Sequence, residues 1–493
     1  MLKLRAWKCF SVVMTLMLVL GLCAAAGPLG CRDPGPVVTI PDAGLEAAIR
    51  EALNKLEGDL YASELAWLQE LDAAARGIQD LQGLEYCTNL KVLVLAANEI
   101  SDISLLANLT SLEVLVLADN QISDISLLFN LTSLKWLVLW GNQISDISLL
   151  ANLTSLEVLA LAKNQIINTL PLVNLTSLTL LSLSENQISD IYPLANLTSL
   201  TTLSLSENQI SNISPLTNLI NLAELGLEHN QISDISTLAY LTSLTTLNLA
   251  RNQISNISPL ANLTSLTCLE LWDNQMSDIS PLANLTSLTT LSLSENQISN
   301  ISSLADLTSL TGLGLGDNQI SDISPLANLT SLTTLSLSEN QISDISSLAD
   351  LTSLTELGLG DNQISDISSL SNLSNLTHLA LDGNQITDII ALSNLTDLRV
   401  VWLDNNDITD ISPLSGLISI GEVGDDDPWL DEREGIKISL DLRYNQITDI
   451  EPLVENEGLS EGDGIDIRGN PLSSYSLNTY IPQLEGRGVN VLL

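Results

Sequence analysis

One 22-residue pattern repeats through most of the chain, and this period restricts the fold more than any other feature. Residues 90–111, LKVLVLAANEISDISLLANLTS, are a representative unit. An asparagine recurs in register at Asn98, Asn120, Asn142, Asn164, Asn186, Asn208, Asn230, Asn252, Asn274, Asn296, Asn318, Asn340, Asn362, Asn384 and Asn406, and again after insertions at Asn445 and Asn470. A fixed short period predicts a solenoid, in which each coil packs only on its neighbours.

The apolar positions of the unit predict the structure of each coil. Leu93 and Leu95 alternate with other side chains, which is typical of a short strand. Ser258-Pro259-Leu260 offers a capping serine and a proline at a first helical position, which predicts a short helical turn on the return side. Stacked coils would then pair their strands as a parallel ladder.

Polar side chains at fixed positions are predicted to satisfy the turns between coils. A turn buried between coils leaves backbone donors and acceptors without water, and an asparagine amide can bind both kinds. We therefore interpret the asparagine column as a structural ladder. The aspartates four residues later, such as Asp102 and Asp322, are predicted to cap the next turn, because Asn212 occupies the same position elsewhere.

Six segments are predicted along the chain. They are an export signal in 1–26, a leader in 27–36, a helical N-terminal cap with a degenerate first repeat in 37–89, fifteen 22-residue repeats in 90–418, two further repeats with acidic insertions in 419–470, and a C-terminal cap in 471–493.

The first 26 residues have the features of an export signal. Lys3, Arg5 and Lys8 precede an apolar run at 10–22, and small residues follow it. The run is too short for a comfortable membrane span. We therefore expect a secreted or cell-surface protein without a transmembrane span, and Cys31 is a weaker candidate for a lipid anchor.

The two ends of the solenoid are predicted to be capped. Leu45, Ile49 and Leu53 have helical spacing behind a capping residue, Asp42, and Trp67 is interpreted as a core residue of the same cap. At the other end, 471–488 predicts a turn and a short helix, and 489–493 a last strand.

Composition and spacing argue against several function classes. The net charge is −42 and there is no basic run after the signal, which disfavours nucleic acid and anionic lipid as partners. Cys87 and Cys268 lie nine coils apart, about 40 Å at the usual strand spacing, so they are not expected to pair.

Catalysis is also not indicated. His229 and His378 lie seven coils apart, about 30 Å, so they cannot share a metal or a triad, and both are interpreted as solvated. No phosphate loop, nucleophile elbow or zinc spacing occurs. We therefore predict no enzyme activity, cofactor or metal site. The acidic insertion GEVGDDDPWLDEREG is interpreted as a solvated loop, with a cation at Asp425, Asp426 and Asp427 as the alternative.

A binding surface is predicted at the strand positions six, four and two residues before each asparagine. In the first five coils these positions are mostly apolar and include two tryptophans, a composition typical of interaction sites. The alternative is that valines merely suit strands and the cap folds over them. The candidates are Val92, Val94, Val114, Val116, Trp136, Val138, Trp140, Val158 and Leu180, with Glu228, Glu270, Trp272 and Trp402 as secondary candidates.

The pattern LxxLxLxxNxIxxIxxLxxL, which runs from Leu90 to Asn406, resembles that of the leucine-rich repeat family. The phrase DISPLANLTSL, from Asp322 to Leu332, and the helical cap resemble the internalin-type repeats of bacterial surface and secreted proteins. The resemblance implies an α/β solenoid, a curved right-handed superhelix with a parallel sheet on its concave face and short 3-10 or helical turns on its convex face. It also implies protein recognition on the concave face.

The sequence thus predicts an exported, non-catalytic and monomeric scaffold that binds an unidentified protein on its concave face, near the N-terminal coils. A carbohydrate or cell-wall binder is the alternative, with exposed tryptophans stacking on sugar rings. A structural envelope protein also fits the plain middle coils.

Overall fold

The structure is a computed structural model, and it describes residues 35–424 and 427–493. The predicted signal, most of the leader with Cys31, and Asp425 and Asp426 lie outside the described residues. The described chain divides into two compact units, one ending at Gln253 and one running from Ile254 to Leu493. Each unit is described by itself.

In the first unit, each coil contributes a short strand and most coils add a 3-10 turn. The strands are β3 (Glu70–Asp72), β4 (Val92–Val94), β5 (Val114–Val116), β6 (Trp136–Val138), β7 (Val158–Ala160), β8 (Leu180–Ser182), β9 (Thr202–Ser204), β10 (Glu224–Gly226) and β11 (Thr246–Asn248). The turns are η3 (Leu84–Tyr86), η4 (Ser104–Leu106), η5 (Ser126–Asn130), η6 (Ser148–Asn152), η7 (Leu170–Leu172), η8 (Tyr192–Leu194), η9 (Ser214–Asn218) and η10 (Ser236–Tyr240).

The second unit is built from the same kind of coil. Its sheet strands are β12 (Cys268–Glu270), β13 (Thr290–Ser292), β14 (Gly312–Gly314), β15 (Thr334–Ser336), β16 (Glu356–Gly358), β17 (His378–Ala380), β18 (Val400–Trp402), β21 (Leu440–Asp441), β22 (Gly464–Asp466) and β23 (Asn490–Leu492). Its 3-10 turns are η11 (Ser258–Leu260), η12 (Ser280–Asn284), η13 (Ser302–Leu304), η14 (Ser324–Leu326), η15 (Ser346–Leu348), η16 (Ser368–Asn372), η17 (Ile390–Leu392) and η18 (Ser412–Gly416). A helix, α4 (Glu451–Glu455), replaces the 3-10 turn in one of the last coils.

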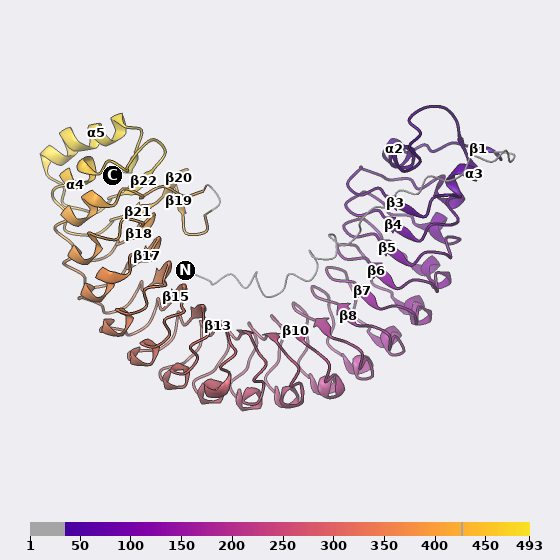
Figure 1. The fold of residues 1–493 in the computed structure, drawn as a ribbon, viewed down its shortest axis with the longest axis horizontal. Coiled ribbons are helices and arrows are strands. Elements are labelled where there is room, and N and C mark those ends of the chain that lie inside the picture. Colours follow the sequence, from indigo (N-terminus) through magenta and orange to yellow (C-terminus); the bar gives the residue numbers. More distant parts are fainter. Residues whose placement is uncertain (1–34, 425–426) are drawn as a thin grey trace. The chain divides into compact units, whose positions relative to one another are not determined.

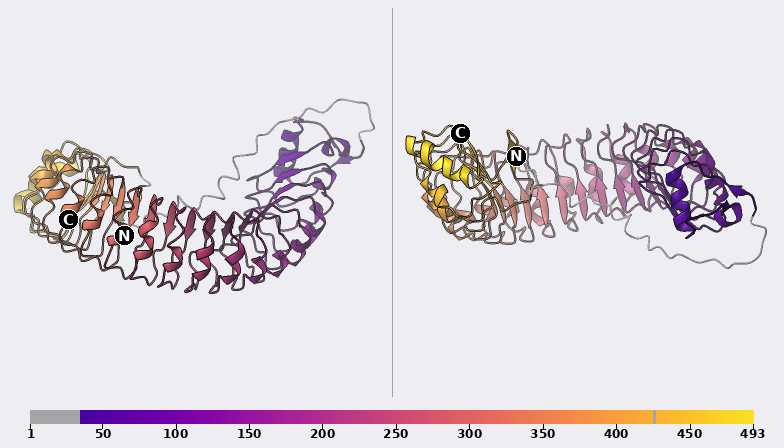
Figure 2. Two further views of the ribbon diagram at one scale, coloured as in Figure 1. Left: turned by 60° about the horizontal axis from the view of Figure 1, so that its bottom comes forward. Right: turned by 90° about the horizontal axis from the view of Figure 1, so that it is seen from above.

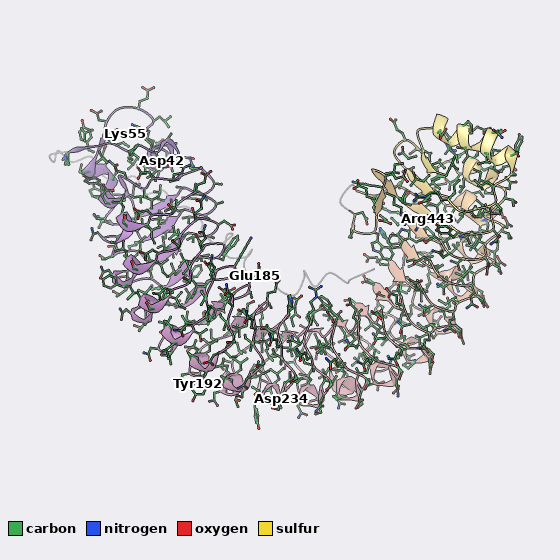
Figure 3. All side chains as sticks on the ribbon, turned by 180° about the vertical axis from the view of Figure 1, so that it is seen from behind. Asp42, Lys55, Glu185, Tyr192, Asp234 and Arg443 are labelled. Carbon is green, nitrogen blue, oxygen red and sulfur yellow. The ribbon has the colours of Figure 1, made fainter. Side chains whose placement is uncertain are left out.

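The strands of each unit form a parallel sheet in register. Leu93 of β4 lies opposite Leu115 of β5, and the same 22-residue offset relates Leu313 of β14 to Leu335 of β15. Within each unit the strands line one side and the turns line the other (Figures 1 and 2). Tyr192 accordingly lies on the turn side of the first unit, and Arg443 on the strand side of the second (Figure 3). This is the solenoid of short parallel strands and return turns that the period and the apolar positions predicted.

The repeated apolar positions form the core between the two sides. Leu93, Leu95, Ile100, Leu106 and Leu109 are all fully buried, and their equivalents are buried in coil after coil. Burying such side chains is the main favourable term in folding, at about 1.5–3 kcal/mol each. The core of each unit is therefore a row of leucines and isoleucines.

The asparagine ladder has the predicted role. The Nδ2 group of Asn208 donates to the carbonyls of Leu183 in the preceding coil, at 3.0 Å, and of Leu205 in its own coil, at 3.1 Å. Its Oδ1 accepts from the backbone N–H of Ile188 at 2.9 Å. One amide thus joins two coils, and the pattern persists at Asn470, the last position of the column.

The aspartates four residues after the ladder position cap the turns, as predicted. Asp102 Oδ1 accepts from Ser104 N at 2.8 Å, and Asn212 makes the equivalent bond to Ser214 at 2.9 Å. These bonds satisfy backbone donors that the short turn leaves open.

Two further columns were not predicted. Threonine hydroxyls donate to the coil before, as from Thr201 to the Thr179 carbonyl at 3.1 Å and from Thr311 to Thr289 at the same distance. The residue before each ladder asparagine is left-handed, with φ from 50° at Asp119 to 58° at Glu339 among the non-glycine residues. Most side chains adopt this conformation at a cost, so the surrounding hydrogen bonds must hold it.

The N-terminal cap contains the predicted helix, α2 (Ala43–Ala52), whose N-cap Asp42 accepts from Leu45 N at 3.0 Å. A two-stranded sheet of β1 (Val37–Val38) and β2 (Leu60–Tyr61) and a short helix α3 (Ala62–Leu65) complete it. The core assignment of Trp67 was wrong, since its side chain is 64% exposed. Leu65 and Leu68 fill the buried positions on either side of it.

The C-terminal cap has the predicted order. A π-helical segment, η19 (Ser476–Tyr480), leads into α5 (Ile481–Gly486), and β23 follows. Pro482 lies near the start of α5, directly after the π-helical residues, and its missing N–H cannot donate to the preceding helical turn.

Cys87 is a free and buried thiol, so it does not pair with Cys268, as the spacing predicted. Burial, reinforced by Glu85, raises the pKa of Cys87 to about 12. Among the residues that the structure describes, no helix is both long and apolar enough to cross a membrane.

We expect Asn208→Ala to lower the free energy of unfolding by about 1–3 kcal/mol, because Ile188 N and the carbonyl of Leu183 would lose their partner between coils. Thermal and urea unfolding followed by circular dichroism would measure the change. Gln209→Ala, at the exposed neighbouring position, is the matched control. A midpoint equal to that of the control would contradict the role of the ladder.

Candidate functional site

The predicted apolar strip lies on the strand side of the first unit, across β4 to β8. Val114, Trp136, Val158 and Leu180 occupy the same register position on four adjacent strands. The parallel register therefore brings together side chains that lie 22 residues apart in the sequence.

The strip is less exposed than the sequence predicted. Val94, Val138 and Val158 are buried, with 7–8% of their surface exposed, whereas Val92, Val114, Val116, Trp136, Trp140 and Leu180 are half-buried. Strands of a sheet lie only about 4.8 Å apart, so each outward side chain is flanked by its equivalents on both neighbouring coils. In a row of valines, each side chain is therefore shielded from solvent by the valines on the neighbouring strands.

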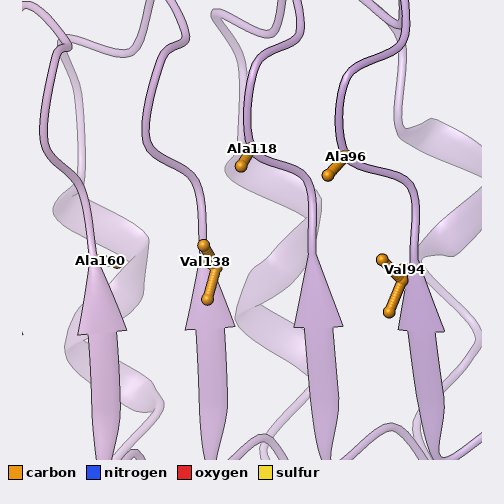
Figure 4. Packing of buried hydrophobic residues seen from close by; sticks show 5 residues of the cluster. All are labelled: Val94, Ala96, Ala118, Val138 and Ala160. Atoms are coloured by element: carbon orange, nitrogen blue, oxygen red, sulfur yellow. The ribbon is translucent and has the colours of Figure 1, made fainter. Parts of the chain in front are cut away.

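Small residues complete the floor of the strip. Val94, Ala96, Ala118, Val138 and Ala160 form one buried cluster (Figure 4). Val92, Val116 and Trp140 pack against it and remain partly open. The result is an apolar floor on which two half-buried indoles are the largest accessible groups.

Charged side chains border this floor. Glu113 lies between Lys135, at 2.9 Å, and Lys91, at 4.0 Å. The hydrogen bond from Lys135 lowers the pKa of Glu113 below its usual value. An apolar centre with a charged rim is the usual anatomy of a protein–protein interface.

The secondary candidates do not form a common site. Glu228 is half-buried in the first unit and accepts from Asn248 Nδ2 at 3.0 Å. In the second unit Trp272 is half-buried, whereas Glu270 is only 2% exposed, so the expectation of an exposed carboxylate was wrong. Glu270 lies directly opposite Ser292 of β13, which restricts its exposure on that side.

The acidic insertion is only partly solvated in its described part. We call residues 419–437 the strap. Its hairpin pairs β19 (Asp431–Arg433) with β20 (Ile436–Ile438) in antiparallel fashion, and Trp429 before the hairpin is only 3% exposed. The solvated interpretation was therefore wrong for Trp429, whereas Asp431, Glu432 and Glu434 are exposed as predicted.

Trp429 rests on the outward side of three successive strands. Its ring centroid lies 5.3 Å from that of His378 on β17 and 5.7 Å from that of Trp402 on β18. Its Nε1 donates to Glu356 Oε2 on β16 at 3.3 Å. Ala380 and Val400 form the buried floor of the same cluster.

Two predictions fail at this cluster. His378 is half-buried rather than solvated, because its Nε2 lies 3.2 Å from Asp427 Oδ2 and its Nδ1 lies 2.8 Å from Thr377 Oγ1. Trp402, a secondary binding candidate, is partly covered by Trp429. Neither contact had a signal in the sequence, since Trp429 lies 73 residues from Glu356.

Buried aspartates hold the other end of the strap. Arg433 donates to Asp441 Oδ2 at 2.7 Å and to Asp466 Oδ2 at 2.9 Å. Both aspartates are almost completely buried. Burial raises the pKa of Asp466, but hydrogen bonds from Arg468 and Arg433 outweigh it, so the pKa lies below its usual value.

The pKa values of two neighbouring carboxyls, Asp382 and Asp404, are raised instead. Burial, with the nearby charge of Asp361, raises the pKa of Asp382 to about 6. Burial and the charges of Asp441 and Asp382 raise the pKa of Asp404 to about 7, against the effect of Arg443. These aspartates thus have folded-state pKa values well above the usual value near 3.9.

His229 is exposed at a left-handed turn position, as predicted. In residues 35–424 and 427–493, no three His, Cys, Asp or Glu side chains form a group that could hold a metal ion.

Comparison with known proteins identifies the family. The model of leucine-rich repeats in two copies matches residues 88–131, 132–174, 176–218, 220–262, 264–306, 308–350, 330–372, 352–394 and 374–416. This chain belongs to the leucine-rich repeat family. None of the curated proteins compared with it matches.

The repeats are of the internalin type. An internalin from Listeria monocytogenes, InlF, is 38% identical over 74% of this chain and 96% of its own, with a TM-score of 0.56. A leucine-rich repeat protein of Leptospira interrogans is 22% identical over 88% of this chain and 97% of its own, with a TM-score of 0.61. The ectodomain of the Arabidopsis thaliana receptor kinase GASSHO1/SCHENGEN3 is 24% identical over 79% and 51%, with a TM-score of 0.61. The last two likenesses concern the fold alone.

The raised pKa of Asp382 predicts a pH-dependent effect of Asp382→Asn. Because the folded pKa, about 6, exceeds the unfolded value near 3.9, ionisation opposes folding, and this penalty accumulates as pH rises from about 4 to 6. We expect the variant to gain stability over the wild type through this range and to keep the gain to pH 8. Thermal midpoints between pH 4 and 8 would measure it.

Asp397→Asn is the control, since it removes an exposed carboxylate between β17 and β18. A difference between Asp382→Asn and wild type that does not change with pH would refute the burial argument.

Proposed function

We propose that this protein is an exported, non-catalytic scaffold that binds a protein on the strand side of its first unit. The observation that carries the proposal is the half-buried pair Trp136 and Trp140, of which Trp140 packs against the apolar floor and Trp136 lies in register with Val114 and Val158. Tryptophan is enriched among the residues that dominate binding energy, and such residues sit in apolar settings ringed by polar groups.

The contrast with later coils supports this location. The equivalent positions of β9 are Thr202 and Ser204, and those of β14 are Gly312 and Gly314. These residues offer little apolar area, and packing of the fold does not require the large side chains of β6. The indoles are therefore better explained by recognition than by the solenoid core.

Family membership is consistent with this role. The GASSHO1/SCHENGEN3 ectodomain was solved in complex with CASPARIAN STRIP INTEGRITY FACTOR 2, and the plant receptor RGFR1 in complex with RGF2. Both resemble this chain in fold only, so they support a binding scaffold in general and not a particular ligand.

Export rests on the sequence of residues 1–26, with their basic start and apolar run. We propose release or surface display on this basis, with a lipid anchor at Cys31 as the weaker route, and a monomeric scaffold. Mass spectrometry of the mature N-terminus would distinguish cleavage near Ala26 from lipid attachment at Cys31.

The double variant Trp136→Ala, Trp140→Ala tests the binding surface. We expect it to lose capture of a protein partner from extracellular extract, because two large contact groups disappear, while its circular dichroism spectrum is unchanged. Ser204→Ala with Ser206→Ala, on β9 and just after it, is the control. Capture retained by the tryptophan variant would refute the site.

A glycan array with the same proteins tests the alternative. Glycan binding by the wild type that is lost in the tryptophan variant would replace the protein ligand by a carbohydrate, with the indoles stacking on sugar rings. No binding in either assay would favour a structural envelope role.

A further inference from the structure

The strap covers the strand side of β16–β18 through a small number of side-chain contacts. Trp429 contributes an aromatic ring to His378 and Trp402 and an N–H to Glu356. Asp427, two residues earlier, contributes a carboxylate to His378. The described contacts of this part of the strap are thus those of a short peptide, with one anchor residue and one charge.

The solenoid does not need the strap for its continuity. Val401 of β18 pairs directly with Leu440 of β21, so the ladder passes beneath the insertion without interruption. The asparagine column also continues, since Asn445 Nδ2 donates to the Leu403 carbonyl at 2.9 Å and Asn445 Oδ1 accepts from Ile408 N at 3.0 Å. The strap is therefore an addition to a coil that closes without it.

The fit between strap and surface leaves one donor unsatisfied. The Nε1 of Trp402 is buried and has no acceptor in the described chain. An unsatisfied buried donor typically costs about 1–3 kcal/mol. A different occupant of the same surface could supply an acceptor that the strap lacks.

We propose that the strand side of β16–β18 is a recognition site for an acidic, tryptophan-containing segment of a partner protein, and that the strap occupies this site in cis. The partner's indole replaces Trp429 between His378 and Trp402, and its carboxylate replaces Asp427 at His378. Opening of the strap exposes the site, and the strap keeps its apolar floor covered when no partner is present. This site belongs to the second unit and does not depend on the function proposed for the first.

Trp429→Ala provides the direct test, with the strap's own sequence as the probe. The peptide acetyl-Asp-Pro-Trp-Leu-amide should bind this variant about tenfold or more tightly than it binds the wild type, because the competing indole of the strap is absent. Isothermal titration calorimetry would measure both affinities. Versions of the peptide with Ala for Trp, or with Asn for Asp, should bind more weakly than the parent.

Further variants locate the binding. Adding Trp402→Ala to Trp429→Ala should abolish peptide binding, whereas adding Trp272→Ala, a half-buried tryptophan of the same unit, should leave it unchanged. Absence of binding to folded Trp429→Ala, or equal binding of the Ala and Trp peptides, would overturn the proposal.

Native-state hydrogen exchange on the unmodified protein is the second measurement, and it does not rely on the variants folding. If the strap opens as a unit, the amides of β19 and β20 should exchange at least tenfold faster than those of β21 and β22. Equal protection in the four strands would make the strap part of the same cooperative unit as the coils, and would sink the proposal.

Discussion

The structure depends on satisfying backbone polar groups that successive coils bury against each other. Each coil turns sharply between the strand side and the turn side, so N–H and C=O groups such as Ile188 N and the Leu183 carbonyl lie where water does not reach them. The ladder asparagines supply one acceptor and two donors at this point, within a volume that still lets the leucines on either side pack. The regular spacing of the coils follows from this requirement as much as from the apolar core.

The same register that builds the core also builds the outer surface of the sheet. The positions six, four and two residues before each ladder asparagine lie opposite the same positions of the next strand. A preference for one type of side chain at such a position therefore produces a row of that type across the sheet. In β4 to β8 the bias is mostly apolar and includes Trp136 on β6 and Trp140 just after it, whereas in β14 the row is glycine. In β16 to β18 it provides Glu356, His378 and Val400, on which Trp429 rests. The two candidate surfaces are thus variants of one repeated geometry.

Electrostatics shape the second unit differently from the first. Lys91, Glu113 and Lys135 alternate in sign along the first sheet and form exposed pairs of small energetic value. Asp382, Asp404 and Asp441 instead carry like charges on successive coils, which together with burial raises the pKa of the first two. Arg433 brings positive charge from the strap to Asp441 of this row and to Asp466 of the next coil, so these two buried carboxylates anchor the strap.

The sequence by itself determined the period, the leucine core, the asparagine ladder and the caps at Asp102 and its equivalents, because each follows from contacts repeated at a fixed offset. It also determined the order of the terminal elements, which follows from local helix and strand patterns. The sequence also predicted which residues form the apolar strip. It did not predict how exposed they are, because the burial of Val94 and Val138 depends on how closely the neighbouring strands flank them. Only the tertiary structure decided the positions of Trp67, His378 and the strap. Their surroundings come from residues at no fixed spacing, as with Trp429 and Glu356, and a repeat pattern carries no information about such contacts.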